Sequence, residues 1–380
     1  MGLTSERTPH PTPLDEDPVD CLRLIRSRRV GPVTWHRLRD EHGSAAAALG
    51  VLPDVARAAG VENYATCPVE VARHELAQGR AAGARLILWG QPDYPPNLLD
   101  LPDAPPVLWA LGDVGLLQRP MVALVGARNA SSLGLRMARR LAEGVGQAGF
   151  VTVSGLARGI DAVVHDSTLA TGTVAVQAGG VDVTYPEENA RLMQDIAAQG
   201  CLVSEQPMGL QPQARHFPLR NRIVSGLSRA VVVVEAASRS GSLITARTAL
   251  DQGRDVLAVP GHPFDARASG CNMLLRDGAT LVRGPADVLE AIGAEVVPFA
   301  PPPEAVAPPL PGPTPARRPL ADIATIHGQI LARLGPSPLA EDQLIRDLSM
   351  PPATLAQHLL TLELDGRVHR APGGLLSRAD

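Results

Sequence analysis

Arginine, serine and glycine residues gather where three short apolar runs of the sequence end. A guanidinium is always charged and presents a planar fork of donors that matches phosphate oxygens. Glycine lets the backbone approach an anion closely. These residue types therefore predict a phosphate-binding rim, and its candidate residues are Gly126, Arg128 and Ser131 after the first run, Ser154, Gly155 and Arg158 after the second, and Ser240, Gly241 and Ser242 after the fifth.

A second concentration of candidates lies between Glu205 and Glu235, where the chain carries no acidic residue. The arginines of this interval are Arg215, Arg220, Arg222 and Arg229. The string at residues 216–222 supplies Phe217, Arg220, Asn221 and Arg222. We expect Phe217 to stack on a base while the arginines hold phosphates. The alternative is a solvated basic face without a ligand.

Composition restricts how such a site could work. Hydrophobic residues make up 45% of the 380 and charged residues 19%, so the chain can bury a large core. All 35 basic residues are arginine, which excludes chemistry that needs a lysine amine. The formal net charge is −4 and aromatic residues are 3%, so a polyanion would bind locally and mainly through its phosphates.

Catalytic and metal-binding patterns are weak. Asp161 and His165 stand four residues apart on an expected helix, but no G-x-S-x-G elbow accompanies them, and structural pairing is the simpler interpretation. The ten histidines form no H-x-x-x-H pair and the four cysteines no C-x-x-C pair. The dinucleotide fingerprint G-x-G-x-x-G is absent. We therefore expect no catalytic residue, no metal and no cofactor.

Six short apolar runs must position the candidate residues. They alternate with helix-length intervals between residues 121 and 292, and they cover residues 122–125, 151–153, 174–176, 202–203, 231–234 and 256–259. Runs buried on both faces and separated by helices are typical of a parallel sheet in a doubly wound, Rossmann-like α/β fold. Ligands of such sheets bind outside the carboxyl ends of the strands, where the glycine-containing turns lie.

The regions that flank this core differ from it in composition. We expect a disordered N-terminus over residues 1–18, a helical domain over 19–90 that resembles a sterile-alpha-motif or helix-hairpin-helix module, the Rossmann-like domain over 91–296, a proline-rich linker over 297–319 and a further domain over 320–380. Gly31 and Pro32 separate two amphipathic stretches of the helical domain. That domain either grips DNA backbone or is a packing module.

The last domain has the pattern of a winged helix. Residues 323–334, 339–348 and 353–364 predict three helices, and residues 366–377 predict a short hairpin. Arginines do not outnumber acidic residues here, so DNA and protein remain equal candidates for its partner.

No part of the chain resembles a membrane segment or a secretion signal. The N-terminal residues lack the apolar core of a signal peptide, and no stretch approaches eighteen consecutive apolar residues. We therefore expect a cytoplasmic protein with no membrane partner.

Taken together, the motifs resemble those of the DNA processing protein A (DprA/Smf) family. The matching strings run in family order from about residue 90 to 290 and comprise residues 94–98, 105–108, 125–128, 154–161 with His165, 185–186, 204–205, 217–223, 240–245 and 259–261. By position, Arg128 corresponds to the family's anion-binding arginine and Arg158 to a basic residue that is often lysine. Ala127 stands where serine or threonine is common.

The resemblance implies a protein of natural transformation that coats incoming single-stranded DNA and loads the RecA recombinase onto it. It also implies a homodimer, an N-terminal sterile-alpha-motif-like domain and a C-terminal winged helix, with single-strand binding proteins as further partners. The rival prediction is a Rossmann-like nucleotide phosphoribohydrolase, for which Glu205 or Glu235 would be the carboxylate beside the ribose. The third possibility is a protein adaptor, which would show neither enzymatic turnover nor DNA binding.

Overall fold

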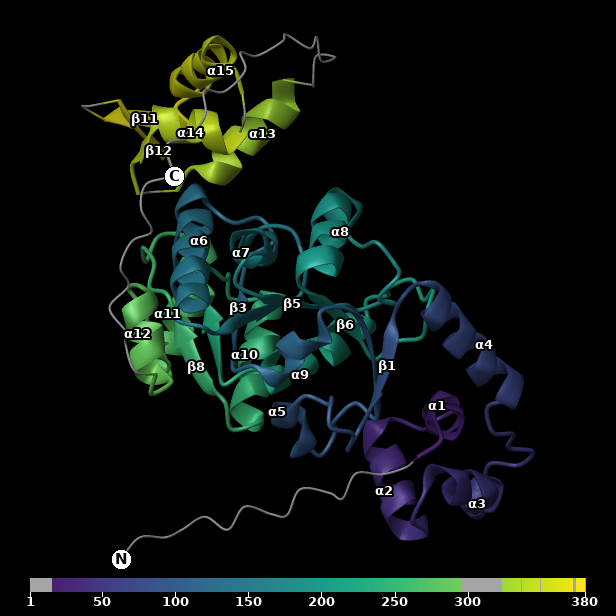
Figure 1. Cartoon of the computed structure of the whole chain (residues 1–380). Coiled ribbons are helices and arrows are strands. Elements are labelled where there is room, and N and C mark those ends of the chain that lie inside the picture. The colour runs from purple at the N-terminus through teal and green to yellow at the C-terminus, as the bar shows by residue number, and fades with distance from the viewer. Residues whose placement is uncertain (1–15, 295–322, 336, 349, 372–373, 380) are drawn as a thin grey trace, which may run out of the picture.

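The computed structural model describes residues 16–294, 323–335, 337–348, 350–371 and 374–379. Residues 1–15 of the expected disordered N-terminus and the whole expected linker over 297–319 lie outside the described residues. The chain forms an N-terminal helical unit, a large α/β unit and a C-terminal unit of helices with a small sheet (Figure 1). None of the described helices is long and apolar enough to cross a membrane.

The N-terminal unit is helical, as predicted. Asp17 and Ser44 cap two of its helices, because their side chains accept hydrogen bonds from Val19 N and Ala47 N. Pro32 occupies the first turn of a third helix, where its missing N–H costs nothing. The helices are α1 (Pro18–Arg26), α2 (Pro32–His42), α3 (Ala45–Ala58) and α4 (Val69–Ala81).

The six apolar runs all form parallel strands of one sheet, which confirms the prediction. The sheet has nine strands in the order β1-β2-β6-β5-β4-β3-β7-β8-β9. The six predicted strands are β3 (Met121–Val125), β4 (Val151–Ser154), β5 (Thr173–Val176), β6 (Cys201–Ser204), β7 (Ala230–Val233) and β8 (Asp255–Ala258), and the short β9 (Thr280–Leu281) adds a parallel edge.

Two antiparallel strands extend the other edge, and they were not predicted from the sequence. They are β1 (Arg85–Leu88) and β2 (Val107–Gly112), and β2 pairs with β6. We expected the large unit to begin at residue 91, but its first strand, β1, precedes that residue. The proline-rich segment between them contains the short helix α5 (Pro96–Leu99). Buried Trp109 of β2 donates to Glu75 Oε1 of α4 at 2.8 Å, which ties the two units together.

Helices cover both faces of the sheet (Figure 1). Alternate residues of the strands, such as Val122 and Leu124, face the first layer, while Ala123 and Val125 face the second. The first layer consists of α6 (Ser132–Gln147), α7 (Ile160–Thr168), α8 (Ala190–Gln199) and α12 (Pro285–Ala291). The second layer consists of α5, α9 (His216–Leu227), α10 (Gly241–Asp251) and α11 (Ser269–Arg276).

The C-terminal unit is a winged helix with its own core, as predicted. Its core residues include Ile330, Leu344, Leu359 and Leu376, all of which are buried. Residues 339 and 340 form a strand rather than the start of a helix. The elements are α13 (Ile323–Arg333), β10 (Leu339–Ala340), α14 (Glu341–Leu348), α15 (Pro352–Leu364), β11 (Val368–Ala371) and β12 (Leu375–Arg378).

The strand order creates one topological switch point. From β3 the chain moves outward through β4, β5 and β6, and it then returns to add β7 and β8 on the other side of β3. The loops after β3 and β7 therefore diverge to opposite faces, which leaves a crevice at their carboxyl ends.

Candidate nucleic-acid interface

The loops that follow β3, β4 and β7 are locked to one another at the switch point. Ala127 N donates to Glu235 O at 2.7 Å, and Ile160 N donates to Ala127 O at 3.2 Å. Gly159 has a φ of +78°, and a Cβ there would overlap the carbonyl of Ala127. A residue with a side chain would force these loops apart, so glycine is required at this position.

These loops enclose two adjoining hollows of about 690 and 710 Å³. The first continues over the residues after β5 toward α8, and the second continues over the start of α10. Because the hollows share part of their walls, they form one elongated depression, which we call the strand-end groove. The residues that line both hollows are Arg128, Gly155, Ala157, Phe217 and Arg220.

Exposed arginines stand along the strand-end groove. Arg128 lies between the hollows, and its guanidinium carbon sits 5.2 Å from the centroid of the Phe217 ring. Arg158 lines the first hollow and forms an ion pair with Glu188 at 3.3 Å, in which both side chains are more than half exposed. Arg239 lines the second hollow. Because an exposed ion pair contributes little, a phosphate can replace Glu188 beside Arg158.

Two aromatic rings form the wall of the first hollow. The ring centroids of Tyr185 and Phe217 are 5.7 Å apart, and Tyr185 is 43% exposed. A ring that is packed on one side and open on the other can take a base on its free face. Tyr185 was not among the predicted site residues, and neither was Arg239. Arg239 directly precedes Ser240, which could have identified it.

Arg220 is buried at the centre of the strand-end groove. Its guanidinium donates to Val176 O at 2.6 Å and to Gly155 O, while Nε donates to Asn221 Oδ1 at 3.2 Å. Burial lowers the pKa of Arg220, although nearby Asp161 opposes this effect. A Cβ at Gly155 would overlap the guanidinium. Arg220 therefore holds the ends of β4 and β5 and supplies positive charge from beneath the surface.

Arg222 does not reach the groove, and the prediction that placed it there is wrong. Arg222 is 7% exposed, and its side chain donates to Asp103 O at 2.8 Å and pairs with the carboxylate of Glu205. Two residues along a helix correspond to about 200°, so Arg220 and Arg222 leave α9 in nearly opposite directions. Arg222 joins α9 to the segment before β2.

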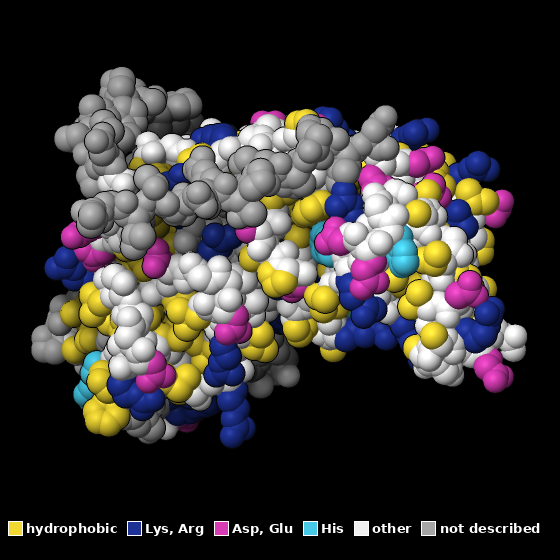
Figure 2. Space-filling model, turned by 90° about the horizontal axis from the view of Figure 1, so that it is seen from below, with side chains coloured by type: hydrophobic (Ala, Val, Ile, Leu, Met, Phe, Trp, Pro, Cys, Tyr) yellow, Lys and Arg dark blue, Asp and Glu magenta, His cyan; other side chains and the backbone are white. Residues whose placement is uncertain are grey.

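The interval from Arg215 to Arg229 is not one basic face. Helix α9 occupies most of it, so the two residues lie at opposite ends of that helix. Arg229 follows the helix, its backbone N–H bonds to Met121 O at the start of β3, and its guanidinium lies over Phe150. Seen from below, arginines and acidic side chains are interspersed on the surface (Figure 2).

Two of the predicted serines are buried in the framework instead of lining the groove. Ser154 Oγ donates to Leu124 O at 2.7 Å. Ser131 caps α6 and donates from its backbone N and its hydroxyl to Glu235, at 2.9 and 2.5 Å. The remaining predicted residues do line the second hollow; they are Gly126, Asn221, Ser240, Gly241 and Ser242.

The carboxylates and the histidine that could have served catalysis are occupied. Burial raises the pKa of Glu205 and Glu235, and each carboxylate is held by Arg222 or Ser131, respectively. Asp161 Oδ2 accepts from Gly155 N at 3.2 Å and from Ala157 N, so it shapes the loop after β4.

His165 is likewise structural. Its Nε2 accepts from Leu156 N at 3.3 Å, its Nδ1 lies 2.7 Å from Thr173 Oγ1, and burial lowers its pKa to about 3. Over the described ranges no group of three potential metal ligands occurs. All four cysteines are free and buried.

Comparisons with known proteins assign all three units. Residues 85–293 match the sequence model of DNA recombination-mediator protein A. Residues 15–77 match the DprA-like N-terminal HHH domain, and residues 313–374 match the DprA winged helix domain.

Individual relatives agree with this assignment. The protein Smf of Synechocystis sp. is 36% identical over an alignment of 306 residues that covers 74% of this chain and 77% of that protein. The structure of DNA processing protein A from Streptococcus pneumoniae is 34% identical, with a TM-score of 0.62 over 73% of this chain and 98% of that one. A structure that addresses the single-stranded DNA binding mode of the Helicobacter pylori protein is 28% identical, with a TM-score of 0.51 over 55% of this chain and 95% of that one. The chain therefore belongs to the DNA processing protein A (DprA/Smf) family.

Proposed function

We propose that this protein binds single-stranded DNA in the strand-end groove. The observation that carries the proposal is the pair of hollows that share Arg128, Phe217 and Arg220, because one continuous groove fits a polymer better than a single nucleotide. The Helicobacter pylori structure that addresses single-stranded DNA binding belongs to a relative of the same fold.

The residues divide this task between charge and stacking. Arg128, Arg158 and Arg239 are exposed and can each hold a phosphate and release counterions. Tyr185 and Phe217 offer ring faces to bases whose identity they do not read. Since phosphates carry no sequence information, we expect weak sequence preference.

The step that follows binding is the transfer of the strand to RecA. This part of the proposal rests on the family resemblance, as do the homodimer, the cytoplasmic location and the absence of catalytic activity. In this account the protein protects incoming DNA and loads RecA onto it in natural transformation, with single-strand binding proteins as further partners. Pairing the grooves of two protomers on one strand would raise avidity without new contacts.

A salt titration tests the binding step. Each phosphate contact with a single strand contributes about −0.7 to the log–log slope of affinity against salt, so three exposed arginines predict a slope of about −2 per protomer. The four arginines expected from the sequence, which are Arg128, Arg158, Arg220 and Arg222, would have predicted about −3. Fluorescence anisotropy measures the affinity for a labelled oligo(dT) strand and for the matched duplex at each salt concentration. Equal affinity for the duplex, or a slope near zero, would contradict the proposal.

The RecA step needs its own measurement. We expect the protein to shorten the lag before RecA hydrolyses ATP on single strands coated with single-strand binding protein. An Arg128→Ala variant should lengthen that lag, while the arginine outside the groove at position 136 provides the control. An unchanged lag with a protein that binds DNA would reject loading but not binding.

A further inference from the structure

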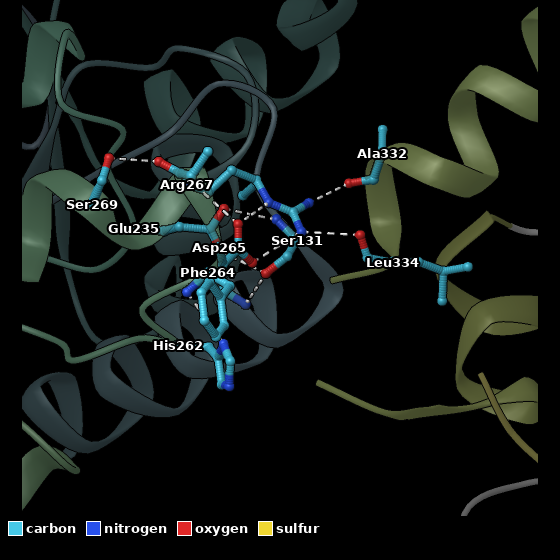
Figure 3. Close-up of polar contacts among 12 residues, drawn as sticks. Ser131, Glu235, His262, Phe264, Asp265, Arg267, Ser269, Ala332 and Leu334 are labelled. Atoms are coloured by element: carbon cyan, nitrogen blue, oxygen red, sulfur yellow. Dashed lines mark hydrogen bonds and ion pairs between the residues drawn. The ribbon is translucent and has the colours of Figure 1, made fainter. Parts of the chain in front are cut away.

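Two arginines fasten the winged helix to the large unit beside the second hollow, and Figure 3 shows the contacts of one of them, Arg267. Arg267, which follows β8, donates to Ala332 O at 2.6 Å and to Leu334 O at 3.0 Å. In return, Arg333 of α13 donates to Ala130 O at 2.9 Å. We call these contacts the latch.

Arg267 is held in the geometry that the latch needs. Its Nε and Nη2 donate to the two carboxylate oxygens of Asp265, each at 3.1 Å. The carbonyls it reaches lie at the C-terminus of α13, where helical carbonyls lack partners within the helix and attract cations. Gly335 lies against this ion pair, because a Cβ there would be 3.1 Å from both Arg267 and Asp265.

The same arginine also lines the strand-end groove. Arg267 belongs to the wall of the second hollow, together with Arg239, Ser240 and Arg128. The loop that Arg333 reaches is the one that carries Arg128. The winged helix thus contacts the loop after β3 and the segment after β8, both of which contribute to the wall of this hollow, and it does so through polar groups.

The guanidinium of Arg267 cannot hold the carbonyls of α13 and a DNA phosphate at the same time. In the latch, Arg267 gives its Nη donors to two neutral carbonyls and to Asp265. A phosphate is an anion, and arginine forms stronger hydrogen bonds with anions than with neutral acceptors. A DNA phosphate in the second hollow therefore competes for Arg267 with the C-terminus of α13.

We propose that Arg267 is a further phosphate-binding residue, which the docked winged helix withholds and which DNA takes over as the winged helix is released. The proposal rests on the proposed function of the strand-end groove. By thermodynamic linkage the competition is reciprocal. Bound DNA weakens the docking of the winged helix by the same factor by which docking weakens the binding of DNA. If the winged helix is docked nine times in ten, the affinity that depends on Arg267 falls about tenfold.

Energy transfer within the full chain tests the release. Donor and acceptor dyes go onto cysteines that replace Arg136 of α6 and Thr361 of α15, both of which are exposed, whereas the four native cysteines are buried. We expect saturating oligo(dT) to lower the transfer efficiency. In an Arg267→Ala chain, the efficiency should be low from the start and should not respond to DNA.

Binding affinities complete the test. Arg333→Ala weakens docking from outside the groove, so we expect it to raise oligo(dT) affinity about five- to tenfold. Adding Arg267→Ala should cancel that gain. Arg346→Ala removes an exposed arginine of α14 that bonds to Gln343 within the winged helix, and it should change neither quantity.

The outcomes separate this proposal from the proposed function. If oligo(dT) binds while the transfer efficiency stays constant or rises, the latch proposal is overturned and the groove stands. If Arg333→Ala raises affinity equally with and without Arg267, the guanidinium is not shared and the proposal is again overturned. If the unmodified full chain does not bind oligo(dT) at all, both the latch proposal and the proposed function are overturned.

Discussion

Among the residues that the structure describes, Arg128 alone places an exposed guanidinium in the walls of both hollows, and replacing it by alanine spares the buried framework beneath it. In the free protein its side chain lies over Phe217 at 5.2 Å, an exposed cation–π contact of about 0.5–1 kcal/mol. We therefore expect the free energy of unfolding to fall by no more than about 1 kcal/mol.

The effect on DNA should be larger. A hydrogen bond to a charged group contributes about 1.5–3 kcal/mol, so losing one phosphate contact should weaken single-strand affinity about tenfold to a hundredfold. The salt slope should become shallower by about 0.7. Fluorescence anisotropy of labelled oligo(dT) over a series of salt concentrations measures both quantities.

A matched arginine serves as the control. Arg136 is exposed on α6 and does not belong to the walls of the two hollows, so Arg136→Ala should alter neither the affinity nor the slope. If Arg128→Ala keeps both the affinity and the slope of the unmodified protein, Arg128 does not touch the backbone. If both variants lose the same amount of single-strand affinity, the affinity depends on the overall charge of the protein and not on a contact in the groove.

Three further predictions concern the frame and the aromatic wall. Arg222→Ala leaves Glu205 buried without its partner, so the free energy of unfolding should fall by about 3–5 kcal/mol in urea denaturation, while the folded variant keeps its DNA affinity. Tyr185→Ala should weaken oligo(dT) binding by about 1–3 kcal/mol through lost stacking and leave the salt slope unchanged in the same titration. Because the pKa of His165 falls from 6.5 to about 3 on folding, its neutral form stabilises the fold above pH 6.5, and this contribution is lost as the pH drops toward 3; urea denaturation of His165→Gln over that range should show a weaker pH dependence.

The parallel core could be predicted because its strands are buried on both faces. Such strands consist of continuous apolar residues, and helices must connect them, so the pattern identifies both. Strands β1 and β2 also contain apolar runs, at residues 86–88 and 107–111, but no amphipathic, helix-length interval separates them. They are antiparallel, need no crossover helix, and are joined through a proline-rich segment that resembles a linker.

The site could be predicted by loop but not by side chain. Glycine and arginine at strand ends identified the loops that meet at the switch point, and most of the predicted residues line the strand-end groove. Helical geometry predicts that Arg222 points away from Arg220, but only if residues 216–227 are first recognised as a helix. That Ser131 would be occupied by Glu235, 104 residues away, depends on tertiary contacts that no local pattern contains.

The contacts of the winged helix were out of reach for the same reason. Arg267 and its acceptor Ala332 are 65 residues apart, and Arg333 and Ala130 are 203 apart. Each arginine, considered alone, is typical of a solvated surface residue. Only the fold shows that the two arginines fasten one unit to another beside the groove.

Hydrogen–deuterium exchange of the full chain, with and without oligo(dT), tests the central claim most directly. We predict slower exchange in the loops at residues 126–130, 155–159 and 238–242, and in residues 211–221 at the start of α9, when DNA is bound, because these segments contribute to the walls of the strand-end groove. Protection confined to the helices of residues 18–81, or to the winged helix, with unchanged exchange in the four segments, would contradict the account.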